Sequence, residues 1–224
     1  MPDPTTPHER TYLPAMGRNA LLPLYDPLTR VLGVASAHRH LVDQAGLEPG
    51  HRVLEVGCGT GNLVLLAKRT QPEATVVGLD PDPAALARAR RKAGRADLDV
   101  RLDRGFADEL PYPDASIDRV LSAFMFHHLP LPEKQQALAE TRRVLTPGGA
   151  LHLLDFSGPA PHSEGFLARL HGHLAPHARR HGLLRDNASD RVRALMVEAR
   201  LTEAVETGRW RSVLGRYSTY RARP

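Results

Sequence analysis

The stretch Val53-Leu-Glu-Val-Gly-Cys-Gly-Thr-Gly-Asn-Leu63 decides the fold of this 224-residue chain. Three glycines, Gly57, Gly59 and Gly61, lie between an apolar segment typical of a strand and an apolar pattern typical of a helix. A backbone without side chains turns sharply and approaches a ligand closely, and the helix that follows offers unpaired N–H groups to polar or anionic atoms. The pattern therefore predicts a strand–turn–helix unit that binds a nucleotide-like ligand.

An acidic residue stands where such a ligand needs one. Asp80 ends the next predicted strand, nineteen residues after Gly61, where a carboxylate accepts both hydroxyls of a ribose. The spacing is G-x-G-x-G rather than the G-x-G-x-x-G of dinucleotide sites, and Glu55 precedes the turn. This acid disfavours a pyrophosphate and favours a cationic amino acid group. The glycines could also form a turn with a purely structural role. This interpretation is weaker, because the position of Asp80 independently indicates a ligand site.

Strands and helices alternate through the rest of the chain. The predicted strands cover 51–56, 74–80, 98–102, 117–124 and 150–156, and the predicted helices between them cover 62–69, 83–93 and 133–145. Pro147, Gly148 and Gly149 are expected to end the last of these helices. A helix over 189–200 and two short strands near 204–207 and 212–220 follow. The alternation indicates an α/β protein with a parallel sheet covered on both faces.

Composition excludes several classes of protein. Apolar residues make up 42% and charged residues 25%, the single cysteine is Cys58, and no apolar run approaches the ~20 residues of a membrane span. The polar segment 1–10 lacks the order of a signal peptide, so a cytoplasmic protein is expected. The net charge of +5 comes from the part after residue 160, which holds twelve arginines and no lysine. We attribute it to genomic base composition rather than to a nucleic-acid partner.

Four segments carry a family resemblance: "VLEVGCGTGNL", "VVGLDPDPAALARAR", "LPYPDASIDRVLSAFMFHHL" and "LAETRRVLTPGGALHLLDF". In this order and spacing, from Val53 to Phe156, they resemble class I S-adenosylmethionine-dependent methyltransferases, in the small-molecule branch that includes ubiquinone/menaquinone-biosynthesis-type enzymes. The resemblance covers about half of the chain. It implies a doubly wound, Rossmann-like, seven-stranded sheet that is mostly parallel, with a C-terminal antiparallel strand and helices on both faces.

The resemblance also implies a site for S-adenosylmethionine. Gly57, Gly59 and Gly61, preceded by Glu55, would line its methionine part, and Asp80 would hold the ribose hydroxyls. The remaining implied cofactor residues are Pro81 near the adenine, the loop Gly105, Phe106 and Ala107, and the strand end Ser122, Ala123 and Phe124. Relatives carry Gly-Asp-Ala where this chain has Gly105-Phe106-Ala107, so the adenine contact is altered, with Asp103 and Asp108 as substitute acceptors.

The sequence defines the binding site for the methyl acceptor less well than the cofactor site. Tyr25 and His127 are the candidate substrate-binding residues, His127 as a base or an acceptor-orienting group, although a loop-capping role for His127 is favoured. No catalytic residue is assigned, because methyl transfer needs little beyond alignment. The predicted organisation is a flexible tail over 1–18 and a single methyltransferase domain over 19–224, with a helical lid over 19–46 and a helical cap over 160–187. The leucines of the cap favour a small, partly apolar acceptor.

Other interpretations stay open at this point. His171, His173, His177 and His181 have the spacing of a metal site, but Pro176 interrupts their helix and no nearby acid or cysteine completes a ligand set, so no metal is predicted. A nucleic-acid methyltransferase, a nicotinamide-dependent oxidoreductase and a non-catalytic cofactor-binding protein are the alternative functions. The sequence does not decide between a monomer and a homodimer.

Overall fold

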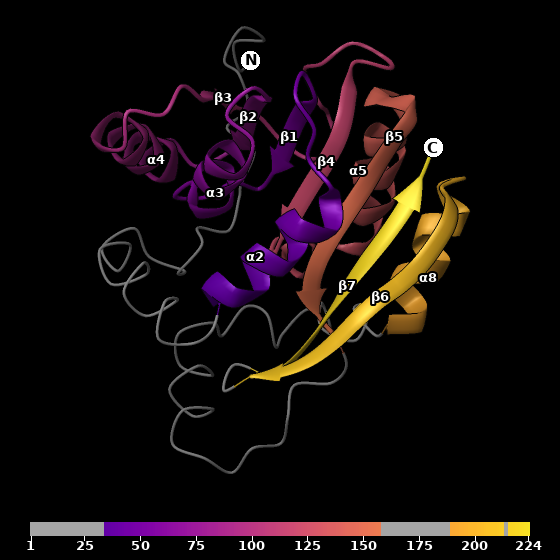
Figure 1. The fold of residues 1–224 in the computed structure, drawn as a ribbon. Coiled ribbons are helices and arrows are strands. Elements are labelled where there is room, and N and C mark those ends of the chain that lie inside the picture. Colours follow the sequence, from indigo (N-terminus) through magenta and orange to yellow (C-terminus); the bar gives the residue numbers. More distant parts are fainter. Residues whose placement is uncertain (1–33, 158–188, 213–214) are drawn as a thin grey trace, which may run out of the picture.

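The protein is built around one seven-stranded sheet. A computed structural model describes residues 34–157, 189–212 and 215–224 (Figure 1). The strand order is β3-β2-β1-β4-β5-β7-β6. The strands are β1 (Arg52–Val56), β2 (Thr75–Asp80), β3 (Arg101–Arg104), β4 (Ile117–Ala123), β5 (Leu145–Phe156), β6 (Thr202–Ser212) and β7 (Gly215–Arg223). Strands β1 to β5 pair in parallel, and β7 lies antiparallel between β5 and β6. The predicted fold class is confirmed.

Helices cover both faces of this sheet. On one face, α2 (Val34–Ala45), α3 (Asn62–Thr70) and α4 (Pro83–Arg95) pack over the strands, with Leu41, Leu63 and Leu86 in one buried cluster (Figure 1). On the other face, α5 (Leu131–Val144) and α8 (Ser189–Glu198) bury Leu138 and Leu195. None of the described helices is long and apolar enough to cross a bilayer.

Burial of the central strands follows from this two-sided cover. All of β2 after its first residue is buried, as expected where helices lie on both faces of a parallel sheet. Because β1 pairs in parallel with both β2 and β4, the carboxyl ends of these three strands lie at the same edge of the sheet. Open α/β sheets bind ligands at this edge.

Two predicted boundaries were wrong. The third strand, predicted over 98–102, lies at β3 because the N–H of Leu98 is used by the end of α4, where it donates to the Ala93 carbonyl. The fifth strand begins at Leu145 rather than at Ala150, because the Pro-Gly-Gly segment is accommodated in an irregularity of the β4–β5 pairing and not in a turn. β6 is also longer than the predicted 204–207, and β7 is shifted towards the C-terminus relative to the predicted 212–220.

The predicted organisation is only partly described. The tail over 1–18 and the cap over 160–187 lie outside the described residues, as do Tyr25 and the four histidines of the cap. Of the predicted lid over 19–46, the described part is α2, which packs on α3 and β5. The lid and the cap stay predictions.

Candidate functional site

A cavity of about 260 Å³ lies at the carboxyl ends of β1, β2 and β4. Ten of the predicted cofactor residues line it: Glu55, Gly57, Gly59, Asp80, Pro81, Gly105, Phe106, Ala107, Ala123 and Phe124. Gly61, Ser122 and His127 do not line it. Residues far apart in the sequence thus meet around one space because their strands are neighbours in the sheet.

The glycine turn forms the floor of the cavity. Gly57 has φ 77° and donates its N–H to the Leu79 carbonyl at 2.8 Å, and a side chain there would overlap Met125. Gly59 has φ 51°, and a Cβ at that position would meet nothing within 4 Å. The turn therefore leaves open space above Gly59 for ligand atoms. Gly61 instead allows close packing, because its missing Cβ would lie 2.8 Å from the Cβ of Ala89 on α4.

Asp80 is fixed by the turn that it faces. Its carboxylate accepts hydrogen bonds from the N–H of Gly59 at 2.8 Å and from the N–H of Asp82 at 2.9 Å. Burial raises the pKa of Asp80, and these two hydrogen bonds act in the opposite direction. Asp82 caps α4 through a 2.8 Å hydrogen bond from the Ala84 N–H. The carboxylate of Asp80 is thus held rigidly at the cavity wall.

Glu55 carries an unsatisfied acidic oxygen. The side chain is 3% exposed, and its Oε2 has no hydrogen-bond partner within the described part of the chain. Burial raises the pKa of Glu55 well above its usual value, and the nearby Asp80 raises it further. A cationic group in the cavity would satisfy this oxygen and stabilise the carboxylate.

A short turn after β3 forms another wall. Phe106 and Glu109 form a bridge, and the Glu109 N–H donates to the Phe106 carbonyl at 3.3 Å. Of the two acids considered as substitute adenine acceptors, Asp108 lines the cavity. Asp103 does not, and its carboxylate instead accepts hydrogen bonds from Arg101 and Tyr112.

The histidine pair follows β4 in a short 3₁₀ helix, Phe126–His128. His128 lines the cavity, whereas His127 is buried behind the wall and contacts Asp155 with its Nδ1 at 2.7 Å. The rings of His127 and His128 lie 3.9 Å apart between centroids. Sequence reasoning singled out His127 and missed both His128 as a wall residue and Asp155 as the partner of His127.

Other wall residues were also missed. His38 comes from α2, and burial together with the positive charge of Lys92 lowers its pKa to about 4. Nothing in the sequence near His38 marks it, since it reaches the cavity only through the packing of α2 on the sheet. Asp82 and Met125 line the cavity as well. Asp82 could have been found from the sequence, because it is an acidic residue that directly follows Asp80 and Pro81.

Ser122 departs from the prediction. It is buried at 4% exposure, and its Oγ has no hydrogen-bond partner among the described residues. The neighbouring Ala123 and Phe124 reach the cavity. Within the same described ranges, no group of three histidine, cysteine or acidic side chains is arranged to hold a metal ion.

Comparisons with known proteins give a consistent result. Residues 53–149 match a family described as "Methyltransferase domain". The chain is 41% identical over 161 residues to the demethylmenaquinone methyltransferase of Deinococcus radiodurans, covering 70% of this chain and 66% of the relative. It is 40% identical over 154 residues to the demethylmenaquinone methyltransferase of Thermus thermophilus, covering 67% of this chain and 69% of the relative. The matches thus span about two thirds of the length of both relatives.

The fold is also similar to a solved structure. An S-adenosylmethionine-dependent methyltransferase from Thermotoga maritima superposes with a TM-score of 0.65 at 20% sequence identity, covering 92% of this chain and 96% of that one. At this identity the likeness concerns the fold alone.

Proposed function

Because the chain belongs to the class I S-adenosylmethionine-dependent methyltransferases, we propose that it transfers a methyl group from S-adenosylmethionine to a small, partly apolar acceptor. The observation that carries the proposal is the pair of buried acids at one cavity, Glu55 with an unsatisfied oxygen and Asp80 fixed by the glycine turn. These groups fit the cationic amino acid end and the ribose hydroxyls of this cofactor.

We assign the cofactor residues from this fit. Glu55 accepts a hydrogen bond from the ammonium group of the cofactor, and the open space above Gly59 holds its methionine part. The absence of a side chain at Gly57 lets Met125 pack close to the turn. Asp80 accepts from the ribose hydroxyls, and the adenine lies between Pro81 and the turn Gly105, Phe106 and Ala107. Where relatives carry an aspartate that accepts a hydrogen bond from the adenine, Phe106 offers an aromatic ring on which the adenine can stack. Asp108 is an acidic residue on the same wall of the cavity.

When bound, S-adenosylmethionine supplies a methyl group on a sulfonium sulfur. The chain contributes alignment and exclusion of water, because transfer needs the acceptor atom, the methyl carbon and the sulfur in one line. Ala123 and Phe124 close the wall next to the turn. No residue of the chain forms a covalent intermediate in this proposal.

The acceptor side is proposed to include His127 and Tyr25. Asp155 holds the Nδ1 side of His127, so its Nε2 is the nitrogen left to orient an acceptor or to take its proton. The cavity wall near His128 is apolar, with Phe124, Met125 and Leu129. This wall supports a partly apolar acceptor. The two relatives named above act on demethylmenaquinone by name, so a quinone of this kind is the first acceptor to test.

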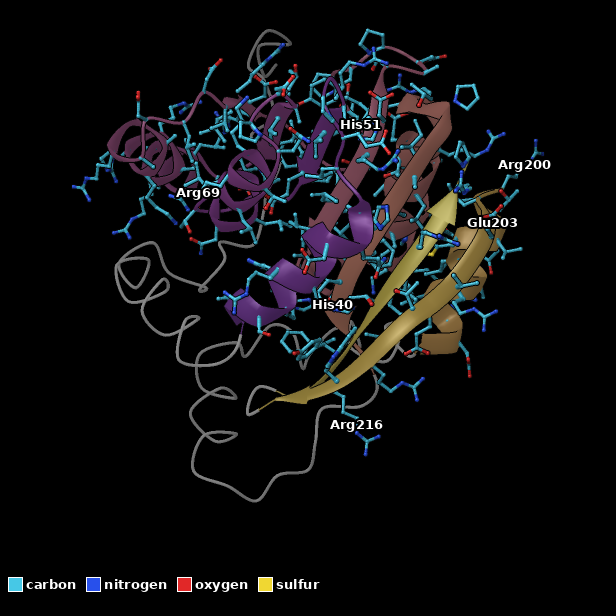
Figure 2. The ribbon with its side chains drawn as sticks, in the orientation of Figure 1. His40, His51, Arg69, Arg200, Glu203 and Arg216 are labelled. Carbon is cyan, nitrogen blue, oxygen red and sulfur yellow. The ribbon has the colours of Figure 1, made fainter. Side chains whose placement is uncertain are left out.

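A nucleic-acid acceptor is not favoured. Of the described arginines near the C-terminal edge, Arg191, Arg209 and Arg223 pair with Glu198, Glu206 and Glu203 at 3.3, 2.7 and 3.0 Å. These three arginines are thus engaged in ion pairs within the edge itself. Figure 2 shows Arg200 and Glu203 at one end of this edge, whereas Arg216 lies at its other end, next to the carboxyl end of β5. We propose a cytoplasmic location, consistent with the lack of a membrane-spanning helix among the described residues.

The first test is calorimetric titration with S-adenosylmethionine, S-adenosylhomocysteine and NADH. We expect micromolar binding of the first two, weakened about tenfold or more by Asp80→Ala, since a hydrogen bond to a charged group contributes about 1.5–3 kcal/mol. Asp103→Ala is the matched control, an acid on the neighbouring strand that does not line the cavity. Binding of NADH in place of the methyl donor would instead indicate an oxidoreductase.

A further inference from the structure

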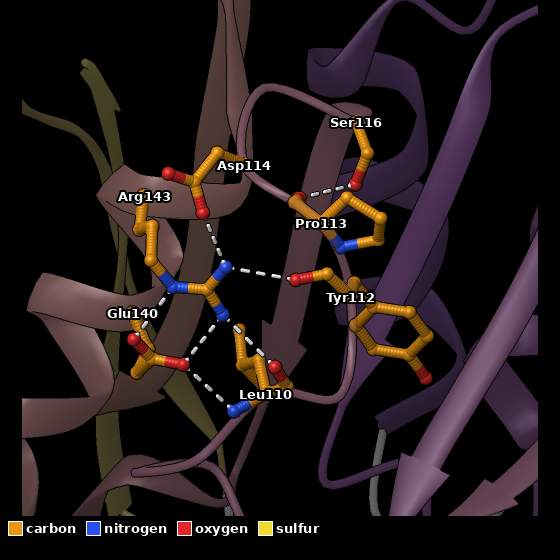
Figure 3. Close-up of polar contacts among 7 residues, drawn as sticks. All are labelled: Leu110, Tyr112, Pro113, Asp114, Ser116, Glu140 and Arg143. Atoms are coloured by element: carbon orange, nitrogen blue, oxygen red, sulfur yellow. Dashed lines mark hydrogen bonds and ion pairs between the residues drawn. The ribbon is translucent and has the colours of Figure 1, made fainter.

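Arg143, near the end of α5, uses all five of its side-chain N–H groups (Figure 3). Its Nε and Nη2 donate to the two carboxylate oxygens of Glu140 at 2.8 and 2.7 Å. Its Nη2 also donates to the Leu110 carbonyl at 2.9 Å. Its Nη1 donates to the Tyr112 carbonyl at 2.8 Å and to the Asp114 carboxylate at 2.7 Å. One guanidinium thus ties helix α5 to the loop between β3 and β4.

Leu110 is held through both of its backbone groups. Its carbonyl accepts from Arg143, and its N–H donates to Glu140 Oε2 at 2.9 Å. The Leu110 side chain is buried at 4% exposure in the core beneath α5. This residue is therefore a fixed point of the loop, set by a charged pair that lies outside the cavity.

Leu110 lies shortly after the segment of the chain that forms this wall of the cavity. The lining residues Gly105, Phe106, Ala107 and Asp108 lie immediately before it, closed into a turn by the Phe106–Glu109 contact. At its other end, the turn is anchored by the Gly105 N–H, which donates to the Asp80 carbonyl at 3.3 Å. The wall segment is thus held between β2 and the Arg143–Glu140 pair.

The pair is charged over the ordinary pH range. Hydrogen bonds from Arg143 lower the pKa of Glu140, and those to Glu140 and Asp114 raise the pKa of Arg143. Two parallel N–H to oxygen contacts give the planar geometry that a lysine lacks. The loop position therefore depends on a guanidinium and not on positive charge alone.

We infer that Arg143 and Glu140 are positioning residues for the nucleobase end of the cofactor cavity, acting through Leu110 on the turn that carries Phe106 and Asp108. The inference rests on the proposed function, since it assigns that turn to the adenine. Neither residue lines the cavity, so each acts on the ligand only through the loop.

The test compares Arg143→Lys with Asp114→Asn. Asp114 also accepts from Arg143, but it is highly exposed and leaves both anchors of Leu110 intact. We expect Arg143→Lys to weaken binding of S-adenosylhomocysteine and of adenosine by about tenfold, and Asp114→Asn by less than about twofold. Hydrogen exchange of the ligand-free protein is expected to rise over 105–112 in Arg143→Lys alone.

The affinities of the variants test the inference, whereas binding by the unaltered protein tests the proposed function. Unchanged affinity in a folded Arg143→Lys protein of lowered Tm would overturn it, because the pair would then stabilise the fold only. Glu140→Gln, which keeps one acceptor for Leu110 and loses the charge, is the second variant if Arg143→Lys fails to fold, and a several-fold loss of affinity is expected. Failure of the unaltered protein to bind either ligand would refute the proposed function, while hydrogen exchange still reports on the loop.

Discussion

Asp155 accepts two hydrogen bonds from a single residue, His127: one from the backbone N–H at 2.8 Å and one on its other oxygen from Nδ1 at 2.7 Å. The carboxylate is fully buried at the carboxyl end of β5, and His127 belongs to the short helix after β4. Burial would raise the pKa of Asp155, but the hydrogen bonds and charge of His127 lower it below its usual value. The pair ties two neighbouring strand ends beside the cavity.

We predict that Asp155→Asn lowers the free energy of unfolding by about 2–4 kcal/mol near pH 7, because an amide cannot accept both hydrogen bonds. A lowered carboxyl pKa stabilises the fold above the ordinary carboxyl value and ceases to do so as pH falls through the folded value. The difference between the two proteins is therefore expected to shrink in acid. Urea denaturation at several pH values measures this, and the exposed Asp43→Asn serves as the control, expected to change stability by under about 0.5 kcal/mol.

Gly59→Ala and Gly46→Ala form a matched pair. Both glycines have similar positive φ, 51° and 54°, and a Cβ at either would meet nothing within 4 Å. Each substitution is therefore expected to cost about 1–2 kcal/mol of stability from backbone strain. Only Gly59 lines the cavity, so only Gly59→Ala is expected to weaken cofactor binding, by about tenfold or more. Equal affinities in the two variants would contradict the placement of the ligand above the turn.

Phe106→Ala tests the altered adenine wall. Stacking of a base on an aromatic ring contributes about 1–3 kcal/mol, so the Kd for S-adenosylhomocysteine is expected to rise about fivefold or more. Phe106→Tyr keeps the ring and is expected to bind like the unaltered protein. A similar loss in both variants would argue against stacking at this position.

Acid sensitivity is predicted to depend on His152. It is 2% exposed, its Nδ1 contacts Gln44 at 3.0 Å, and burial, with Arg119, Arg221 and Arg223, lowers its pKa to about 3. The unfolded chain takes up a proton near pH 6.5 while the folded protein does not. Stability is thus lost by about 1.4 kcal/mol per pH unit from pH 6.5 down to about 3. A shallower slope in His152→Gln is the expected result of urea titrations, and an unchanged slope would refute the assignment.

The sequence was sufficient for the parts of the site that are local. The turn of Gly57 and Gly59 and the acid Asp80 were predictable, because backbone conformation and strand-end position follow from neighbouring residues. The other residues that line the cavity as predicted, Pro81, Gly105, Phe106, Ala107, Ala123 and Phe124, were implied by the family resemblance and not by the local pattern. The roles of these residues in cofactor binding stay proposals.

The parts that were missed depend on tertiary packing. Asp155 reads in the sequence as the polar end of a buried strand, and only the adjacency of β4 and β5 brings it to His127. His38 reaches the cavity because α2 packs over β5 and β4. The true start of β3 depends on its register with β2, in which Val77 pairs with Arg101. The alternating apolar residues over 98–102 carry no information about that register.

The strand order has a consequence for biosynthesis. Since β1 sits between β2 and β4, one edge of β1 has no partner until β4 is made, and β1 ends at Val56 whereas β4 begins only at Ile117. At about 5–20 residues per second, this apolar edge stays unpaired for several seconds. The nascent methyltransferase therefore carries an aggregation-prone edge for that time, during which chaperone capture competes with self-association, until β4 emerges and covers it.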